Sequence, residues 1–473
     1  MEKFFKLKEN GTTVSTEIMA GITTFFAMSY ILFVNPSVLG STGMPVQAVF
    51  LATILASIVG TVAIGLIANV PYALAPGMGL NAFFAYTVVL SLGYTWQEAL
   101  AMVFICGIVN IIITFTSVRK VIILGIPESL QQAIGGGIGI FIAYIGIKNA
   151  GILQFIADPG TYANNHGTIT ANSSIVPGLV NFNNAGVLVA LIGIVVTMFF
   201  VLRNWKAGIL LSILVTTVIA IIAGVVKIDI NTLFTQNNLG TAFGQMGQTF
   251  GAAFGPKGFG TLFSEPSKYI EVLMTVLAFA LTSIFDPIGT FIGTGRSTGI
   301  FTDEDLKDME NSHGFSSKMD KALFADMIAT PIGAIFGTSN TTVFVESVAG
   351  IGAGGRTGLT SIVTAIMFAI SSLFLPLLSI VPTQATAPIL IVVGAMMLGS
   401  FKNIEWTDLG EAIPAFFASV FMGLGYSISY GIAAGFITYI FVKIFKGKIA
   451  EIKPVIWVVA ILFVLNFVVL AIL

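Results

Sequence analysis

Three acidic residues lie inside long apolar stretches of the sequence, where a charged side chain is costly. They are Asp286 in SIFDPIGTFIG, Asp326 in ADMIATPIG and Glu346 in TSNTTVFVES. A charged carboxylate at the centre of a bilayer costs about 2.5–3.5 kcal/mol on insertion scales, so such groups face a bundle interior or a water-filled cavity. Carboxylates there can accept hydrogen bonds from a polar ligand or exchange a proton. These residues are therefore the first candidates for function.

Asp286 is followed by Pro287 and shares a helix face with small or polar residues. Residues three and four positions away on a helix lie on the same face. On this face they are Thr282, Ser283, Gly289 and Thr290. Pro287 cannot donate a hydrogen bond to the carbonyl of Ser283, and it disfavours helical geometry at Asp286. We therefore predict a bend or break in the helix here, with a free carbonyl beside the carboxylate. The alternative is a purely structural kink.

Glu346 follows a stretch rich in Thr, Ser and Asn, which compete for backbone hydrogen bonds and favour an unwound, cavity-lining segment. Glu346 is then expected at the start of a half-helix, and Thr342 lies in the unwound part. Asn81, in APGMGLNAFFAY, occupies the comparable place in the first half of the chain, where Gly79 permits close backbone approach. We interpret Asn81 as a ligand-binding residue, with a structural role as the alternative.

The remaining candidates carry less specific patterns. Asp326 suits a packing role and a proton-coupling role equally. Tyr30 and Phe84 are expected to be core aromatics, although either can stack on a flat ligand. His166 and His313 fall in loops, so we do not expect them to relay protons.

The elements that carry these residues are hydrophobic enough to lie in a membrane. Of the 473 residues, 56% are hydrophobic and 9% are charged, whereas soluble domains have about 25% charged residues. The composition predicts a polytopic helical membrane protein. The formal net charge of −1 shows no excess of basic residues, which a nucleic-acid-binding protein would need. Cys106 is the single cysteine, which excludes a disulfide framework and a cysteine-based metal site.

Apolar runs of about 17–25 residues can cross a bilayer as helices. Such runs lie at 17–39, 46–69, 96–117, 130–148, 186–202, 207–226, 270–294, 322–337, 357–381, 384–400, 408–422, 428–446 and 455–472. Two further segments, 72–92 and 338–352, are interrupted by Pro, Gly, Thr and Asn and are interpreted as discontinuous half-helices. Lys3, Lys6 and Lys8 precede the first span, so the positive-inside rule predicts a cytosolic N-terminus.

The two halves of the chain echo each other. QAVFLATILASIVG at 47–60 is similar to KALFADMIATPIGA at 321–334, and three further pairs of segments match in the same order. A repeat with seven spans is odd in number, so its second copy must be inverted. Secondary transporters with this architecture bind substrate near the midplane, between discontinuous helices. The site is therefore expected between 72–92 and 338–352.

The chain resembles the AzgA-like hypoxanthine/guanine/adenine permeases, within the nucleobase–cation symporter 2 (xanthine/uracil permease) group. The similarity covers essentially the whole chain and rests on APGMGLNAFFAY (75–86), IFDPIGTFIGTGRSTGIF (284–301) and the long segment 325–365. It implies an all-α polytopic membrane protein with a fourteen-helix, seven-plus-seven inverted repeat. Two residues depart from the family pattern: Pro287 stands where many relatives have Thr, and Ser283 where many have an acid.

The resemblance also implies a core domain and a gate domain built from both halves. The expected parts are a cytosolic N-terminus at 1–16, core parts at 17–118 and 270–381, gate parts at 119–230 and 382–446, an external loop at 231–269 and a C-terminal hydrophobic segment at 447–473. The side of the membrane on which that last segment ends is left open.

The implied function is proton-coupled uptake of a purine base across the cell membrane by alternating access. The expected substrate-binding residues are Glu346, Asn81, Asp286, Thr342, Phe84 and Tyr30. The expected proton-coupling residues are Asp286, Glu346 and Asp326, and the supporting residues are Ser283, Pro287, Thr290 and Gly79. The expected partners are a purine base and the lipid bilayer, with a homodimer as a candidate assembly, no nucleic acid, no metal and no cofactor besides the coupling proton.

Two other functions stay open at this point. One is a permease for uracil or xanthine, because the residues alone do not select purines. The other, from a different class, is a polytopic membrane enzyme with the carboxylates as acid and base. Such an enzyme would need a metal or a nucleophile in the membrane, and the sequence contains no His or Cys cluster to supply one.

Overall fold

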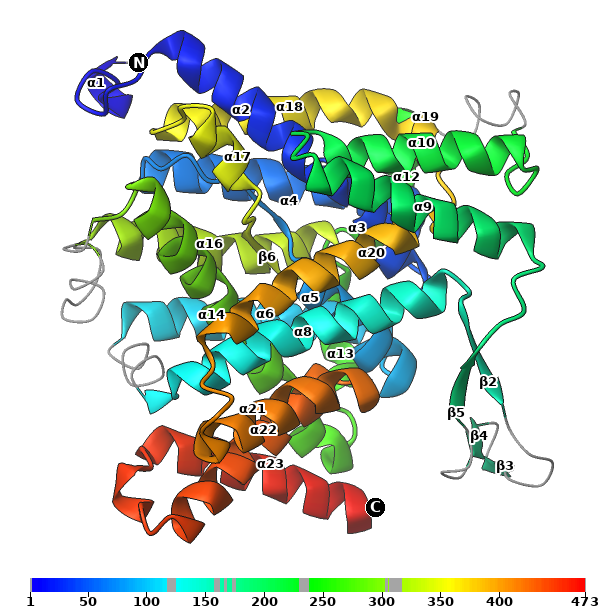
Figure 1. The fold of residues 1–473 in the computed structure, drawn as a ribbon, viewed down its shortest axis with the longest axis vertical. Helices are drawn as coiled ribbons and strands as arrows, with labels where there is room; N and C mark the ends of the chain where they lie inside the picture. The colour runs from blue at the N-terminus through cyan, green and yellow to red at the C-terminus, as the bar shows by residue number, and fades with distance from the viewer. Residues whose placement is uncertain are drawn as a thin grey trace.

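The computed structural model describes residues 2–116, 125–156, 162–165, 168–171, 176–228, 238–302, 305 and 317–472. His166 and His313 lie outside these ranges. Most helices run side by side along one direction, which is horizontal in Figure 1. The short helix α1 (Glu2–Phe5) lies at one end of this direction. Two hairpins lie at the other end, β2 (Leu153–Ile156) with β5 (Val176–Leu179) and β3 (Tyr162–Asn165) with β4 (Thr168–Ala171). We call these ends the α1 side and the hairpin side.

One set of helices, the first helix group, combines the beginning of the chain with residues 269–371. Its long members are α2 (Val14–Met28), α3 (Ile31–Gly40), α4 (Val46–Ile67), α6 (Trp96–Phe115), α14 (Tyr269–Thr298), α16 (Lys318–Phe336) and α18 (Gly358–Ser371). Helix α4 packs against both α16 and α18, α2 packs against α18, and α6 packs against α14 and α16. The two halves of the chain are therefore interleaved in this group.

The second helix group is built from six further helices that come from both halves. Its members are α8 (Glu128–Asn149), α9 (Ala185–Leu202), α10 (Gly208–Ile222), α20 (Thr383–Met397), α21 (Leu409–Leu424) and α22 (Ile428–Phe445). Helix α8 lies between α20 and α21, and α9 packs against α10 and α20. The α8–α20 crossing depends on glycine, because a Cβ on Gly139 would come within 2.6 Å of the carbonyl oxygen of Gly394.

The two interrupted segments contain strands as well as short helices. The first runs through β1 (Leu74–Pro76), α5 (Met78–Ala82) and the π-helix η1 (Phe83–Ser91), and the second through β6 (Thr341–Val343) and α17 (Ser347–Gly352). Strand β1 pairs with β6 in antiparallel register, with Ala75 opposite Thr342. A backbone in the membrane must satisfy its N–H and C=O groups within the protein. The strand pair does this where the helices stop, so each predicted half-helix (α5 with η1, and α17) is accompanied by a short strand.

Other elements also differ from the sequence-based expectations. Helix α14 continues from Tyr269 to Thr298 with Pro287 inside it, so the expected break at this proline does not occur. The expected external loop at 231–269 includes the helices α12 (Leu239–Thr249) and α13 (Phe259–Leu262), and α12 packs against α4. The apolar run predicted at 455–472, by contrast, does form a helix, α23 (Pro454–Ile472), which packs against α22 of the second group and α14 of the first.

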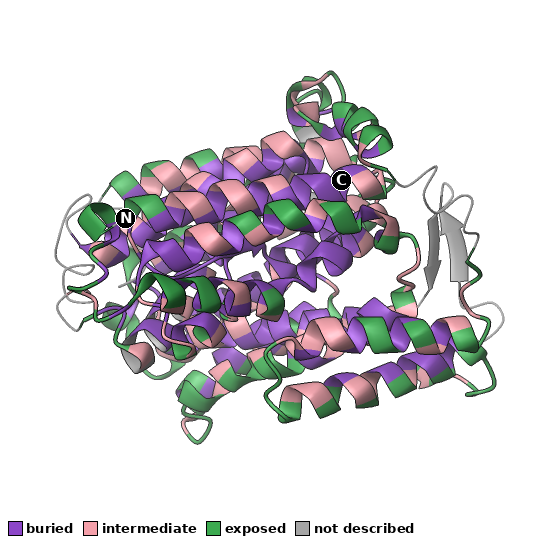
Figure 2. Cartoon of the chain, turned by 90° about the horizontal axis from the view of Figure 1, so that it is seen from above, coloured by how far each residue is buried: buried purple, intermediate pink, exposed green. Residues whose placement is uncertain are grey.

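The surface of the helices is apolar, as a lipid environment requires. In the described ranges, nine helices are long and apolar enough to cross a membrane. Buried residues are concentrated between the helices, and exposed ones cover their outward faces (Figure 2). Large exposed apolar side chains on these faces include Val195, Phe199, Val218, Ile222, Phe416, Phe421, Ile366 and Ile370. The protein is therefore a multi-pass membrane protein.

Candidate functional site

Glu346 lies at the crossing of the interrupted segments and is held by a tyrosine from the other half of the chain. It immediately precedes α17, as predicted for the start of a half-helix. Tyr30, in the gap between α2 and α3, donates from Oη to Oε1 of Glu346 at 2.6 Å. The tyrosine is 1% exposed, so this short bond to an ionisable group is sheltered from water. Tyr30 thus orients the carboxyl group with its hydroxyl.

Asp286 brings a second carboxyl group to the same place. It lies near enough to Glu346 for the two groups to interact electrostatically, and it also lies beside the hydroxyl of Thr342. Asp286 and Glu346 are both partly exposed, although most of their neighbours are buried. Two like charges repel each other, and a proton or an N–H donor placed between them relieves that repulsion. The pair can therefore receive a ligand that donates hydrogen bonds.

Asp326 stands behind this pair and holds the strand β6. Its Oδ1 accepts a hydrogen bond from the backbone N–H of Val343 at 2.7 Å, and the residue is 1% exposed. Its carboxyl group also interacts electrostatically with that of Asp286. The sequence left two roles open for Asp326, packing and proton coupling. This geometry suits the packing role, while proton coupling through Asp326 stays a prediction.

Asn81 joins the two interrupted segments through hydrogen bonds of its side chain. It is fully buried, its Nδ2 donates to the carbonyl oxygen of Pro76 at 3.3 Å, and its Oδ1 accepts from the hydroxyl of Ser339. Both ends of the amide are thus used inside the protein. The geometry matches the structural role that was the alternative for this residue, and direct contact with a ligand stays a prediction.

A buried polar network surrounds Ser283, and its central residue was missed by the sequence reasoning. Asn340 donates from Nδ2 to Oγ of Ser283 at 3.2 Å and to Sγ of Cys106 at 3.4 Å. Several buried polar atoms here have no hydrogen-bond partner within the described part of the chain: Oδ1 of Asn340 and the hydroxyls of Thr282 and Thr341. Leaving such a group unpaired costs about 1–3 kcal/mol, so these atoms favour a site that water or a ligand completes. The Thr- and Asn-rich run TSNTT was the available signal.

The other predicted residues lie around the crossing in supporting positions. Phe84 is fully buried in η1 and does not present its ring to an open space. The backbone carbonyl of Thr290, one turn after Asp286, accepts from the hydroxyl of Thr294. Gly79 does permit a close approach, but to a helix of the second group, since a Cβ there would lie 2.5 Å from Cγ2 of Ile138.

A further buried carboxyl group, Glu17 in α2, was also missed. It is 0% exposed and accepts hydrogen bonds from the backbone N–H groups of Arg356, Thr357 and Thr360 and from the hydroxyl of Thr360. These donors lie at the beginning of α18, where free N–H groups favour a negative charge. Glu17 therefore joins α2 to α18. Its position in the first turn of an apolar helix gave no sign of this.

Comparisons with known proteins cover nearly the whole chain. A family model described as "Permease family" matches residues 15–434. Guanine/hypoxanthine permease PbuO of Bacillus subtilis (strain 168) is 40% identical over 470 residues, which are 98% of this chain and 100% of that protein. Adenine permease AdeP of Escherichia coli (strain K12) is 36% identical over 468 residues, or 99% of this chain and 96% of that protein.

A solved structure identifies the fold. The transmembrane domain of a cyanobacterium bicarbonate transporter, BicA, superposes with a TM-score of 0.60 at 15% identity, covering 89% of this chain and 96% of that one. At this identity the likeness concerns the fold alone. The predicted fold class, a helical inverted-repeat transporter with two discontinuous segments, is confirmed, with the strand pair β1–β6 as an addition.

Proposed function

Since the chain belongs to the permease family whose model matches residues 15–434, we propose that it imports purine nucleobases through the cell membrane together with protons. It is a transporter and not an enzyme. The observation that carries the proposal is the pair of partly exposed carboxyl groups, Asp286 and Glu346, at the crossing of the two interrupted segments. The names of the relatives, permeases for guanine, hypoxanthine and adenine, support a purine as the substrate.

The carboxyl pair suits the hydrogen-bonding edge of a purine. A neutral purine presents ring N–H donors and ring-nitrogen acceptors on one flat edge. Tyr30 occupies Oε1 of Glu346, so Oε2 is the oxygen that we assign to a ring N–H of the base. The hydroxyl of Thr342, which lies beside the carboxyl group of Asp286, can donate to a ring nitrogen instead. Asp286 then accepts a second N–H or carries the coupled proton.

Movement of one helix group against the other would expose this site to each side in turn. On the hairpin side, individual hydrogen bonds join the two groups, including one between the hydroxyls of Ser37 and Thr386 at 3.4 Å. Asn149 of α8 donates to Oη of Tyr86 at 2.8 Å, and the hydroxyl of Thr87 donates to the carbonyl oxygen of Tyr426 at 3.2 Å. Each such bond contributes only about 0.5–1.5 kcal/mol, so these contacts can break during a transport cycle. In this proposal the N-terminus and the α1 side are cytosolic.

The central test is binding and uptake by a Glu346→Gln variant. We expect this variant to insert normally into the membrane and to lose hypoxanthine binding, because the amide replaces one acceptor oxygen with a donor. Glu411→Gln, at an exposed position on α21, is the matched control and should bind like the wild type. High-affinity hypoxanthine binding by Glu346→Gln would refute the assignment of the site.

Proton coupling needs a separate measurement. We expect a protonophore to abolish uptake of labelled hypoxanthine against its gradient, and we expect Asp286→Asn to bind hypoxanthine but not accumulate it. Accumulation that survives full collapse of the proton gradient would exclude proton symport. Competition by unlabelled adenine, guanine, hypoxanthine, xanthine and uracil in the same assay identifies the preferred base.

A further inference from the structure

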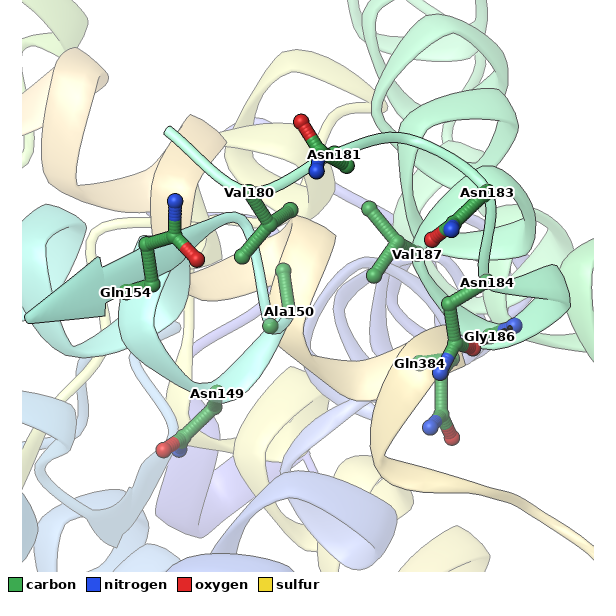
Figure 3. Close-up of a pocket in the computed structure, with 11 residues that line it drawn as sticks. Asn149, Ala150, Gln154, Val180, Asn181, Asn183, Asn184, Gly186, Val187 and Gln384 are labelled. Atoms are coloured by element: carbon green, nitrogen blue, oxygen red, sulfur yellow. Dashed lines mark hydrogen bonds between the residues drawn. The ribbon is translucent and has the colours of Figure 1, made fainter. Parts of the chain in front are cut away.

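A cavity of about 460 Å³ opens on the hairpin side of the second helix group (Figure 3). Its wall consists of the end of α8 with the residues that follow it, the segment 180–187, and Gln384 at the beginning of α20. None of the residues that carry the carboxyl site lines it. Its volume lies within the range of about 300–1,000 Å³ that is typical of small-molecule sites.

The lining of this cavity combines a rim of carboxamides with an apolar floor. The carboxamides are those of Asn149, Gln154, Asn181, Asn183, Asn184 and Gln384, and no charged residue is among the described residues that line the cavity. Figure 3 shows Gln154 on one side, Asn183, Asn184 and Gln384 on the other, and Ala150, Val180 and Val187 between them. Each carboxamide offers a donor and an acceptor. A neutral, flat molecule with donors and acceptors around its edge matches this lining.

Three of these carboxamides are available to a ligand. The side chain of Gln154 donates to the carbonyl oxygen of Leu179, and that of Asn184 accepts from the N–H of Gly186. The side chains of Asn181, Asn183 and Gln384, by contrast, form no hydrogen bond with any described part of the protein. Asn and Gln side chains are also those that pair with the hydrogen-bonding edge of adenine in nucleic acids.

We propose that this cavity, formed by Asn149, Asn181, Asn183, Gln384 and the apolar floor, is an outer capture site for the nucleobase. The proposal rests on the proposed function, since it assigns the same substrate to a second place. Asn149 links the capture site to transport, because its Nδ2 donates to Tyr86 of the interrupted segment. A base that forms a hydrogen bond with the side-chain amide of Asn149 competes with Tyr86 and so weakens this contact between the helix groups. Occupancy of the cavity then favours opening toward the carboxyl site.

The test is equilibrium binding of labelled hypoxanthine to the purified full-length protein. We expect two classes of site per chain in the wild type. Glu346→Gln should lose the tighter class and keep the weaker one. The triple variant Asn181→Ala, Asn183→Ala, Gln384→Ala should lose the weaker class, keep the tighter one, and raise the KM of uptake roughly tenfold at unchanged maximal rate. Asn403→Ala, at an exposed position on another part of the chain, is the control.

The outcomes separate the two proposals. A single class of site that Glu346→Gln abolishes, or a triple variant with wild-type binding and KM, overturns the capture site and leaves the transport function intact. Wild-type protein that binds hypoxanthine only at a site insensitive to Glu346→Gln overturns the proposed carboxyl site instead. A KM effect of the triple variant together with a lower melting temperature than Asn403→Ala would mark the change as structural and also overturn the capture site.

Discussion

Replacing Tyr30 with Phe is the most direct test of how the carboxyl site is organised. The substitution removes one hydroxyl and leaves the ring, whose centroid lies 6.3 Å from that of Phe344. The lost interaction is the 2.6 Å hydrogen bond to Glu346. Hydrogen bonds to charged groups contribute about 1.5–3 kcal/mol, which corresponds to a factor of about 10–150 in an equilibrium constant. If the bond orients Oε2 toward the ligand, hypoxanthine affinity should fall by about this factor.

The assay is the Kd for hypoxanthine of the purified variant, measured together with its melting temperature. Tyr72→Phe is the matched control, because the hydroxyl of Tyr72 is also buried but hydrogen-bonds to Thr294 and not to a carboxyl group. We expect Tyr72→Phe to bind hypoxanthine like the wild type. A Kd of Tyr30→Phe within twofold of the wild type would show that Tyr30 does not position Glu346, and the reasoning from the 2.6 Å contact would be wrong.

Three further predictions concern stability and movement. Glu17→Ala leaves the donors at the beginning of α18 without an acceptor and should lower the free energy of unfolding by about 3–6 kcal/mol, seen as a lower melting temperature than that of Glu17→Gln. Gly79→Val should slow hypoxanthine uptake by separating α5 from α8, and adding Ile138→Ala to the same chain should restore the uptake rate. An uptake rate that stays low in the double variant would contradict the close contact between Gly79 and Ile138. Hydrogen bonds from Lys446 and from the N–H of Gly410 lower the pKa of Asp408 below its usual value. Its stabilisation is therefore complete above about pH 4 and lost as the pH falls through the lower folded-state pKa. The melting-temperature difference between wild type and Asp408→Asn should shrink as the pH falls below about 4. A difference that does not change with pH would refute a stabilising role of the Asp408 carboxylate.

The sequence predicted the residues of the candidate site because polar residues are conspicuous in membrane-spanning segments. Acidic residues in apolar runs and the Thr- and Asn-rich interruption at 338–352 identified the regions of Asp286 and Glu346, which the structure brings together. The interruption also predicted that Glu346 would precede a short helix, and it does. These features follow from local composition and from the cost of burying charge, so no knowledge of the fold was needed.

The partners of these residues could not be predicted in the same way. Tyr30 and Glu346 are 316 positions apart, and a tyrosine among apolar residues looks like any core aromatic. The same applies to Ser339 as the partner of Asn81 and to the N–H groups bound by Glu17, since each contact depends on how distant helices pack. At Pro287 the expected break was wrong, because helix α14 is continuous through the proline, while the expected bend stays a prediction.

The antiparallel pairing of β1 with β6 has a consequence for how the two halves of the molecule depend on each other. Tyr30 and β1 come from the amino-terminal half, while Glu346 and β6 come from the carboxy-terminal half. Neither half alone contains all the residues of the candidate site, so the two halves depend on each other as the subunits of a heterodimer do. If the amino-terminal and carboxy-terminal halves are produced as separate fragments, we expect hypoxanthine binding only when both are expressed together. A substitution at Ala75 should weaken the association of the two fragments as much as one at Thr342 does.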